Sequence, residues 1–302
     1  MCPLSDTHAH ARVAQKKRRP LWVVLLLVLA WLAAEAYENG WFEREPPLAE
    51  GPIVLASWNI ANLGGSKDAA EIRMMAETMR DFDLVAVQEV ITSPAGADAV
   101  ARLDAALDRT GAAWDYAISD PTTGRGTERY AFFWKPSAVR LTGRPWLDRR
   151  LDPLVDREPY LGRFEARASG RQLLVASFHA VPKNKDPKLE NRLLYHLEAD
   201  YPDDDLVVAG DFNLDAADEA FDGLRQAGFR AALAGEATTL KMFPSETGET
   251  RANPYDNLFY ESDALRPLRT GVADFSARFP TLKAARAVSD HLPVWMEVGF
   301  VE

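Results

Sequence analysis

Short apolar runs that end in polar side chains recur along this sequence and constrain its fold more than any other feature. The clearest run, residues 206–209, is followed by Gly210 and then by Asp211 and Asn213. Its length and β-branched residues predict a strand buried on both faces. Positions two apart in an extended segment point the same way, so Asp211 and Asn213 would face one space while Phe212 turns toward the core. A turn closed by an aspartate cap would give a similar pattern.

Strand and helix patterns alternate from residue 53 to the C-terminus. The chain has 302 residues, 47% of them hydrophobic, which is enough for one large α/β domain. Several expected strands follow one another without a helix, which favours two packed mixed β-sheets flanked by helices over one parallel sheet. We therefore expect a single domain over 53–302. Its expected helices lie at 71–80, 97–107, near 188–200 and near 216–227, and its expected strands lie at 53–60, 81–90, 129–136, 171–180, 206–209, 255–260 and 292–298.

The first 52 residues have the pattern of an export or anchoring signal. A basic leader, 1–19, precedes a hydrophobic segment, 20–37, and a linker, 38–52. The uncharged run from Pro20 to Ala34 has fifteen residues, whereas a signal-peptide core has roughly 7–15 and a spanning helix ~20. Aromatic residues near both ends favour a hydrophobic helix that anchors the chain in a membrane with its domain outside the cytoplasm. The small residues around Glu35 instead fit a cleavage site, after which the domain would be secreted or periplasmic.

The charge of the chain argues against tight nonspecific binding of nucleic acid. The net charge is −10, yet the leader alone carries +4, so the remainder carries −14. Such a domain has no electrostatic footprint for tight nonspecific nucleic-acid binding, but it can handle phosphates through a metal ion. The only cysteine is Cys2, so no disulfide can form within the chain.

Polar residues suited to acid–base or metal chemistry stand at the ends of separate expected strands. Each alone has an ordinary explanation, such as a solvated charge or a turn cap. Together they indicate one polar site where several strand ends meet. The residues are Asn59, Glu89, His179, Asp211, Asn213, Asp256, Asp290 and His291.

The motifs around these residues resemble those of the endonuclease/exonuclease/phosphatase superfamily, and most closely its pancreatic-type deoxyribonucleases. Their order and spacing match from about residue 53 to the end. The resemblance implies a four-layered α/β sandwich that hydrolyses a phosphoester with a divalent metal. The motifs are SWNI with Asn59, VQEV with Glu89, ERYAFFWKP with Glu128, REPYLGRF at 157–164, SFHAVP with His179, GDFN with Asp211 and Asn213, YDN with Asp256, and SDHLPV with Asp290 and His291.

A small set of oxygen donors is expected to hold the metal. Hard divalent cations prefer oxygen ligands, and Mg²⁺ needs only one or two carboxylates when it keeps most of its waters. Glu89 and Asp290, helped by Asn59, are the predicted ligands of Mg²⁺, with Mn²⁺ or Ca²⁺ as alternatives. Asp290 and His291 are adjacent, so both reach one cavity only if they lie in a turn before the last strand.

The remaining site residues are assigned to the reaction itself. His291 is the predicted general base, because imidazole titrates near neutrality, and Asp256 would orient its ring. Asp211 and Asn213 would orient the attacking water and hold a nonbridging phosphate oxygen. These roles suit a phosphodiester, whose negative charge repels hydroxide.

The resemblance also assigns residues around the phosphate and shows two departures. It implies that His179, paired with Glu128, donates to the phosphate or the leaving oxygen, and that Arg157 grips the phosphate. The deoxyribonucleases place an arginine and a tyrosine against the DNA minor groove where this chain has Ile91 and Gly126, so neither contact is available here.

We therefore expect a divalent-metal-dependent phosphodiester hydrolase, foremost a deoxyribonuclease-like endonuclease acting outside the cytoplasm. A phospholipid or phosphoinositide hydrolase and a catalytically silent binding module are the alternatives. We expect a monomer without an obligate protein partner. The segment 183–188 is expected to be a solvated loop or a basic phosphate-binding loop, and the polar loop 238–254 is a candidate wall of the cleft.

Overall fold

The computed structural model describes residues 25, 26, 28–32, 47–152 and 154–302. It divides into two compact units, Met1–Pro46 and Pro47–Glu302. In the first unit the described residues are helical. The predicted leader, most of the hydrophobic segment and residues 38–46 of the predicted linker lie outside the described residues. Within the described part of the chain, no helix is long and apolar enough to cross a membrane.

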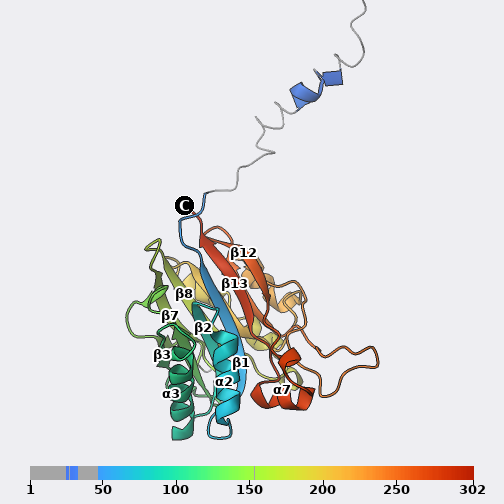
Figure 1. Cartoon of the computed structure of the whole chain (residues 1–302). Helices are drawn as coiled ribbons and strands as arrows, with labels where there is room; N and C mark the ends of the chain where they lie inside the picture. Colours follow the sequence, from blue (N-terminus) through green and yellow to red (C-terminus); the bar gives the residue numbers. More distant parts are fainter. Residues whose placement is uncertain (1–24, 27, 33–46, 153) are drawn as a thin grey trace, which may run out of the picture. The chain divides into compact units, whose positions relative to one another are not determined.

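Six strands form the first sheet of the second unit, in the order β12-β13-β1-β2-β4-β3 (Figure 1). The pair β1 and β2 is parallel and the other pairs are antiparallel. The sheet also brings the described start of this unit beside its end, since Leu48 bridges to Val301. The strands are β1 (Ile53–Leu63), β2 (Leu84–Val90), β3 (Asp115–Ile118), β4 (Arg129–Trp134), β12 (Leu265–Val272) and β13 (Val294–Phe300).

The second sheet runs in the order β10-β11-β9-β8-β7-β5, and β6 also pairs with β7. Here β8 and β9 are the parallel pair. A cluster of buried side chains from both sheets, including Leu55, Phe132 and Val207, fills the space between them. The strands are β5 (Val139–Leu141), β6 (Trp146–Leu147), β7 (Tyr160–Ala166), β8 (Gln172–His179), β9 (Leu206–Asp211), β10 (Phe229–Ala231) and β11 (Asp256–Glu261).

Helices cover the outer faces of both sheets, which completes the expected four-layered sandwich. In Figure 1, α2, α3 and α7 lie against the first sheet. Shorter helices pack on the second sheet around Phe212 and Phe221. The helices are α2 (Ala69–Met79), α3 (Pro94–Asp108), α4 (Lys188–Asn191), α5 (His196–Asp200), α6 (Asp222–Gln226) and α7 (Leu282–Val288), with 3₁₀ turns η1 (Lys183–Lys185), η2 (Glu219–Phe221) and η3 (Ser276–Arg278).

Several elements differ from the sequence-based expectations. The helices expected near 188–200 and 216–227 are each divided into short pieces, α4 with α5 and η2 with α6. Helices this short depend on packing against the sheet, so their limits follow tertiary contacts instead of local periodicity. No strand was expected at β3, β5, β6, β7, β10 or β12. Most are short or carry polar residues, and pairing with neighbouring strands stabilises them.

Candidate active site

The strand-end residues meet at one end of the two sheets. Asn59 and Glu89 stand near the ends of the parallel strands β1 and β2, and such ends lie at the same edge of a sheet. His179 and Asp211 end the second parallel pair, where they are register partners. Antiparallel strand β11 begins where β9 ends, so Asp256 lies opposite Asp211.

A carboxylate–imidazole pair forms one half of this site. Nδ1 of His291 lies 2.9 Å from Oδ2 and 3.0 Å from Oδ1 of Asp256. Thr238 donates its hydroxyl to Oδ2 of Asp256 at 2.6 Å, which fixes the carboxylate from the other side. The opposite ring nitrogen, Nε2 of His291, lies 3.6 Å from Oδ2 of Asp211. The imidazole is therefore held between two buried carboxylates.

Asn59 links the carboxylates of the two sheets. Its Nδ2 donates to Oε1 of Glu89 at 2.9 Å and to Oδ2 of Asp211 at 3.1 Å. Its Oδ1 accepts from the amide of Ala61. In this arrangement Asn59 orients two carboxylates, and its predicted role as a metal ligand stays a prediction.

Glu89 sits on an irregular part of its strand. Its φ is 61°, in the left-handed region that is unusual for a residue with a side chain. The pairing of β2 shifts register after Val87, so Glu89 is displaced from the regular ladder. Its Oε2 accepts from the amide of Asn62 at 3.0 Å. A backbone irregularity thus aims this carboxylate at the site.

His179 forms a second histidine–carboxylate pair. Its Nδ1 lies 3.0 Å from Oε2 of Glu128, and its Nε2 lies 3.4 Å from Oδ2 of Asp211. Arg157 is also buried and reaches the same carboxylate at 3.2 Å, while it donates to the carbonyls of His179 and Ala180. Three side chains far apart in sequence are thereby held in one rigid group.

The residues after β9 adopt the turn that the sequence had left open as an alternative. The amide of Asn213 donates to Oδ1 of Asp211 at 2.9 Å, and Asn213 has a φ of 50°. Phe212 is buried among the outer core of the second sheet, as expected. Nδ2 of Asn213 donates to the carbonyl of Ala180. Asp211 and Asn213 therefore share one side of the site through an aspartate-capped turn.

Asp290 and His291 lie between α7 and β13, in the turn that the sequence predicted. Asp290 pairs with Arg286 at 2.9 Å. Ser289 accepts from the amide of His291 and donates to the carbonyl of Asn59 at 2.7 Å. The indole of Trp58 donates to the carbonyl of His291. These bonds attach the turn to β1.

The protonation of both histidines follows from their carboxylate neighbours. Burial lowers the pKa of His291, but Asp256 and Asp211, with a further contribution from Asp290, outweigh it and raise the pKa to about 10. Burial likewise lowers the pKa of His179, but the negative charge of Glu128 outweighs this effect, so the pKa is raised overall. The neighbouring carboxylates thus stabilise the protonated form of both rings.

The donor set fits a divalent cation. Oxygens of Asp211 and Asp256 and a ring nitrogen of His291 lie within 4.8 Å of one another. Asp211 and Asp256 are only 1% and 2% exposed, and Glu89 lies one hydrogen-bonded asparagine away. The predicted metal ligands Glu89, Asp290 and Asn59 are not members of this group, whose three residues are the predicted catalytic ones.

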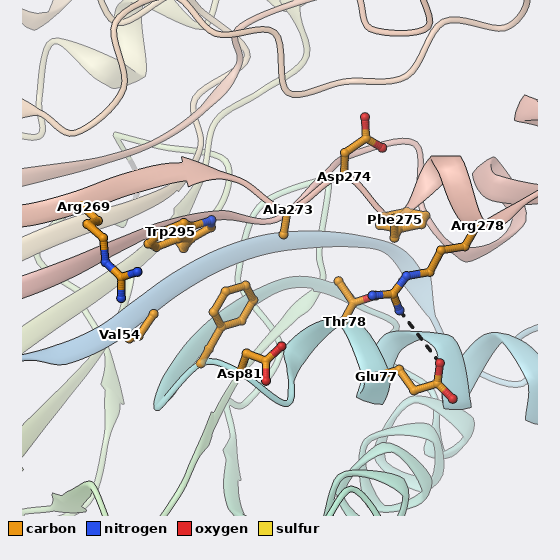
Figure 2. A pocket seen from close by; sticks show the side chains of 11 residues that line it. Val54, Glu77, Thr78, Asp81, Arg269, Ala273, Asp274, Phe275, Arg278 and Trp295 are labelled. Atoms are coloured by element: carbon orange, nitrogen blue, oxygen red, sulfur yellow. Dashed lines mark ion pairs between the residues drawn. The ribbon is translucent and has the colours of Figure 1, made fainter.

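Two hollows of the domain differ in chemistry. The hollow of about 350 Å³ in Figure 2 is lined by residues of α2, β12, β13 and η3, and contains none of the predicted site residues. Its walls are apolar at Phe275 and Trp295, and Arg278 reaches Glu77 at 3.9 Å. Another hollow, of about 370 Å³, is lined by Glu89, Glu128 and Arg157 and adjoins the cluster.

Some residues that shape the site carried no sequence signal. Thr238 bonds to Asp256 from the start of the polar loop that the sequence nominated as a cleft wall. The buried ammonium of Lys67 donates to the carbonyls of Ala287 and Val288 at the end of α7, just before the turn that holds Asp290 and His291. Only Ser289, adjacent to Asp290, could have been found from its motif.

One other sequence expectation concerns residues outside the cluster. Lys183 and Lys185 of the 183–188 segment are exposed, as in a solvated loop.

The four-layered sandwich thus carries buried carboxylates and two histidines at the ends of its strands. The model of the Endonuclease/Exonuclease/phosphatase family matches residues 56–291, and the chain belongs to this family. By this membership it is an enzyme that hydrolyses phosphodiester bonds. Members of this family generally use divalent metals, which agrees with the donor set.

One named relative and two solved structures are similar to this chain. A protein named "Deoxyribonuclease" from Thioalkalivibrio sp. (strain K90mix) is 30% identical over 302 residues, covering 92% of this chain and 76% of the relative. The human nocturnin catalytic domain with bound sulfate has a TM-score of 0.58 at 17% identity, over 85% of this chain and 99% of its own. D. rerio TDP2 complexed with a single-strand DNA product has a TM-score of 0.58 at 15% identity, over 82% and 99%. The two structures share the fold of this chain.

Proposed function

We propose that this protein is a divalent-metal-dependent deoxyribonuclease-like endonuclease that acts outside the cytoplasm. The observation that carries the proposal is the cluster in which Asp211 lies within 3.6 Å of both His179 and His291 and is bonded to Asn59. DNA is the proposed substrate because the relative named "Deoxyribonuclease" matches nearly the whole chain.

His291 is the proposed general base. Asp256 holds Nδ1, so Nε2 is the nitrogen that faces Asp211 and the site. In this position Nε2 can accept a proton from a water that Asp211 orients. The turn through Ser289 and Trp58 fixes the ring against β1, so the base needs little reorganisation during the reaction.

The phosphate would lie between His179 and Asn213. Protonated His179, kept charged by Glu128, can donate from Nε2 to a nonbridging or leaving oxygen. Asn213 would contact a second oxygen from the opposite side of the turn. Arg157 can supplement them through the second N–H group of each terminal nitrogen, although all three guanidinium nitrogens already donate within the protein.

Glu89 and Asp290, aided by Asn59, would hold the metal, with Mg²⁺ as the proposed ion. When bound, the ion would neutralise charge on the phosphate and on the surrounding carboxylates, which lowers the pKa of His291 toward that of a base. Arg286 keeps Asp290 oriented through its 2.9 Å contact.

The N-terminal segment supports a location, which is likewise part of the proposal. The basic leader followed by the uncharged run 20–34 would place the enzymatic domain outside the cytoplasm, tethered to the membrane or released after cleavage. We propose that it acts as a monomer.

The test compares three substrates for the full-length protein, with Mg²⁺ and with EDTA. Supercoiled plasmid, sphingomyelin vesicles and bis(4-nitrophenyl) phosphate are supplied in parallel. Nicking of the plasmid that EDTA abolishes supports the proposal. Hydrolysis of the vesicles or the small diester alone would contradict the DNA substrate, and activity unaffected by EDTA would contradict the metal.

A further inference from the structure

We infer that Arg125 binds a phosphate that flanks the scissile one, so that the site is built for a polynucleotide strand instead of a small phosphoester. This inference rests on the proposed function. Its starting point is the hollow of about 370 Å³ beside the cluster, whose lining includes Glu89, Glu128 and Arg157 on one side and residues 125–127 on the other.

Beyond the metal proposed at Glu89, the hollow needs a cation that can hold a neighbouring phosphate of an anionic strand. Glu89 and Glu128 both face it. Arg157 is only 6% exposed and is occupied by Glu128 and two carbonyls. Arg129 is directed elsewhere, since it donates to the carbonyl of Ser119.

Arg125 is the remaining arginine of this lining. Its side chain is exposed, and among the described residues it has no hydrogen-bond or ion-pair partner. A guanidinium in this state is available to a phosphate, which it can bind with two parallel hydrogen bonds.

The backbone beneath Arg125 is held in place by Asp156. The two oxygens of that carboxylate accept from the amides of Arg125 at 2.8 Å and Gly126 at 2.9 Å. Asp156 is fixed in turn, because its own amide donates to Glu190 at 2.6 Å. The loop is thus bonded to the segment that carries Arg157.

The flanking glycines show how closely this loop approaches Asp156. A β-carbon at Gly124 would lie 1.9 Å from the carbonyl oxygen of Asp156, and one at Gly126 would lie 2.4 Å from its carboxylate. Close packing explains the two glycines, but it does not require an arginine between them, whose side chain makes no hydrogen bond or ion pair to the described residues. A phosphate of the substrate supplies the reason for that side chain.

This contact would favour a polynucleotide over an isolated phosphodiester as the substrate. A polynucleotide carries a further phosphate on either side of the scissile one, whereas an isolated diester carries none. Contacts to flanking phosphates contribute affinity and register without reading the base sequence. Such a contact also offsets the absence of the minor-groove arginine and tyrosine at Ile91 and Gly126.

The experiment uses full-length wild type, Arg125→Ala, Arg125→Lys and a control, Arg230→Ala. Arg230 is exposed on β10 and lines a different hollow, so its loss removes the same charge from another place. Steady-state rates are measured on a short DNA duplex and on bis(4-nitrophenyl) phosphate across a salt series, and melting temperatures verify folding.

For Arg125→Ala we expect KM on the duplex to rise about tenfold with little change in kcat. We also expect the slope of log(kcat/KM) against the logarithm of the salt concentration to become shallower by about one. Arg125→Lys, which keeps the charge, should restore the wild-type slope. Rates on the small diester and those of Arg230→Ala should match wild type.

Other results would overturn the inference in distinguishable ways. An unchanged KM and salt slope in Arg125→Ala, with the wild type nicking DNA, would reject only the role of Arg125. An equal loss on duplex and small diester would mean that Arg125 acts at the scissile phosphate. A wild type that hydrolyses the small diester but not DNA would reject the proposed substrate together with the inference.

Discussion

Asp256 and His291 lie 35 positions apart in the sequence, yet Oδ2 of Asp256 and Nδ1 of His291 are 2.9 Å apart. The contact joins the two sheets of the sandwich, because Asp256 begins β11 and His291 precedes β13. It fixes which ring nitrogen faces Asp211 and hence which can take a proton.

We expect His291→Ala to lower turnover by about 10²- to 10⁴-fold, the usual contribution of a general base. Asp256→Asn should also lower turnover, because the ring loses its orienting carboxylate. His196→Ala is the control, since His196 lies on α5 outside the cluster. Plasmid nicking rates are compared after circular dichroism confirms folding, and near-normal turnover in His291→Ala would disprove the assigned base.

Glu89→Gln should lower the affinity of the site for Mg²⁺. The Mg²⁺ concentration that gives half-maximal activity should therefore rise by at least about tenfold. The amide keeps the size of the side chain but loses the charge that attracts the cation. Glu77→Gln serves as the control, because Glu77 lines the separate hollow in Figure 2. Titration calorimetry gives the metal affinity directly, and an unchanged affinity would remove Glu89 from the ligand set.

A third prediction concerns stability and pH. Burial, followed by Asp108 and Asp115, raises the pKa of Asp104 on α3 to about 6, and one of its oxygens is buried without a hydrogen-bond partner among the described residues. The folded protein therefore holds this proton more tightly than the unfolded chain, and it loses stability as the pH rises from about 4 to 6.

Asp104→Asn removes that ionisation. We expect it to stabilise the protein by about 1 kcal/mol at pH 7, a value reduced because the side chain is partly exposed, and by almost nothing at pH 4. Asp98→Asn, which changes an exposed carboxylate of the same helix, should show no such gain. Urea unfolding at both pH values measures the difference, and an equal effect at pH 4 and pH 7 would contradict the assigned cause.

The positions of the site residues could be predicted because strand ends are visible in sequence. Asp211 and His179 each follow a buried apolar run, and parallel neighbours place their ends together. The turn before the last strand followed from the adjacency of Asp290 and His291. The end of β1 was predicted less well, since that strand continues past residue 60 to Leu63.

The remaining features depend on contacts that local sequence does not encode. The left-handed φ of Glu89 arises from a register shift between β2 and β4. The bond from Thr238 to Asp256 requires the loop to fold back across eighteen positions. The motif around Arg157 predicts that this residue binds the phosphate. In the structure, however, most of the N–H groups of its side chain donate to groups within the protein.

Gly210 provides a final prediction, because it is the residue that separates the apolar run of β9 from Asp211. It is paired with Phe178 across the parallel strands, and a β-carbon there would lie 1.8 Å from the carbonyl oxygen of Phe178. Gly210→Ala must push β9 away from β8, which we expect to cost about 2 kcal/mol or more in the free energy of unfolding. Because Asp211 follows directly, the same shift would lengthen its contacts to Asn59 and His179.

We therefore expect Gly210→Ala to lower turnover even at temperatures where the protein remains folded. Gly65→Ala is the matched control, since the added methyl would meet only the side chain of Ala95 at 3.4 Å, an ordinary contact. Urea unfolding and plasmid nicking are measured on both variants. If Gly210→Ala lost stability but kept full turnover below its melting temperature, the strands could separate without moving Asp211, and the close approach at Gly210 would serve the fold alone.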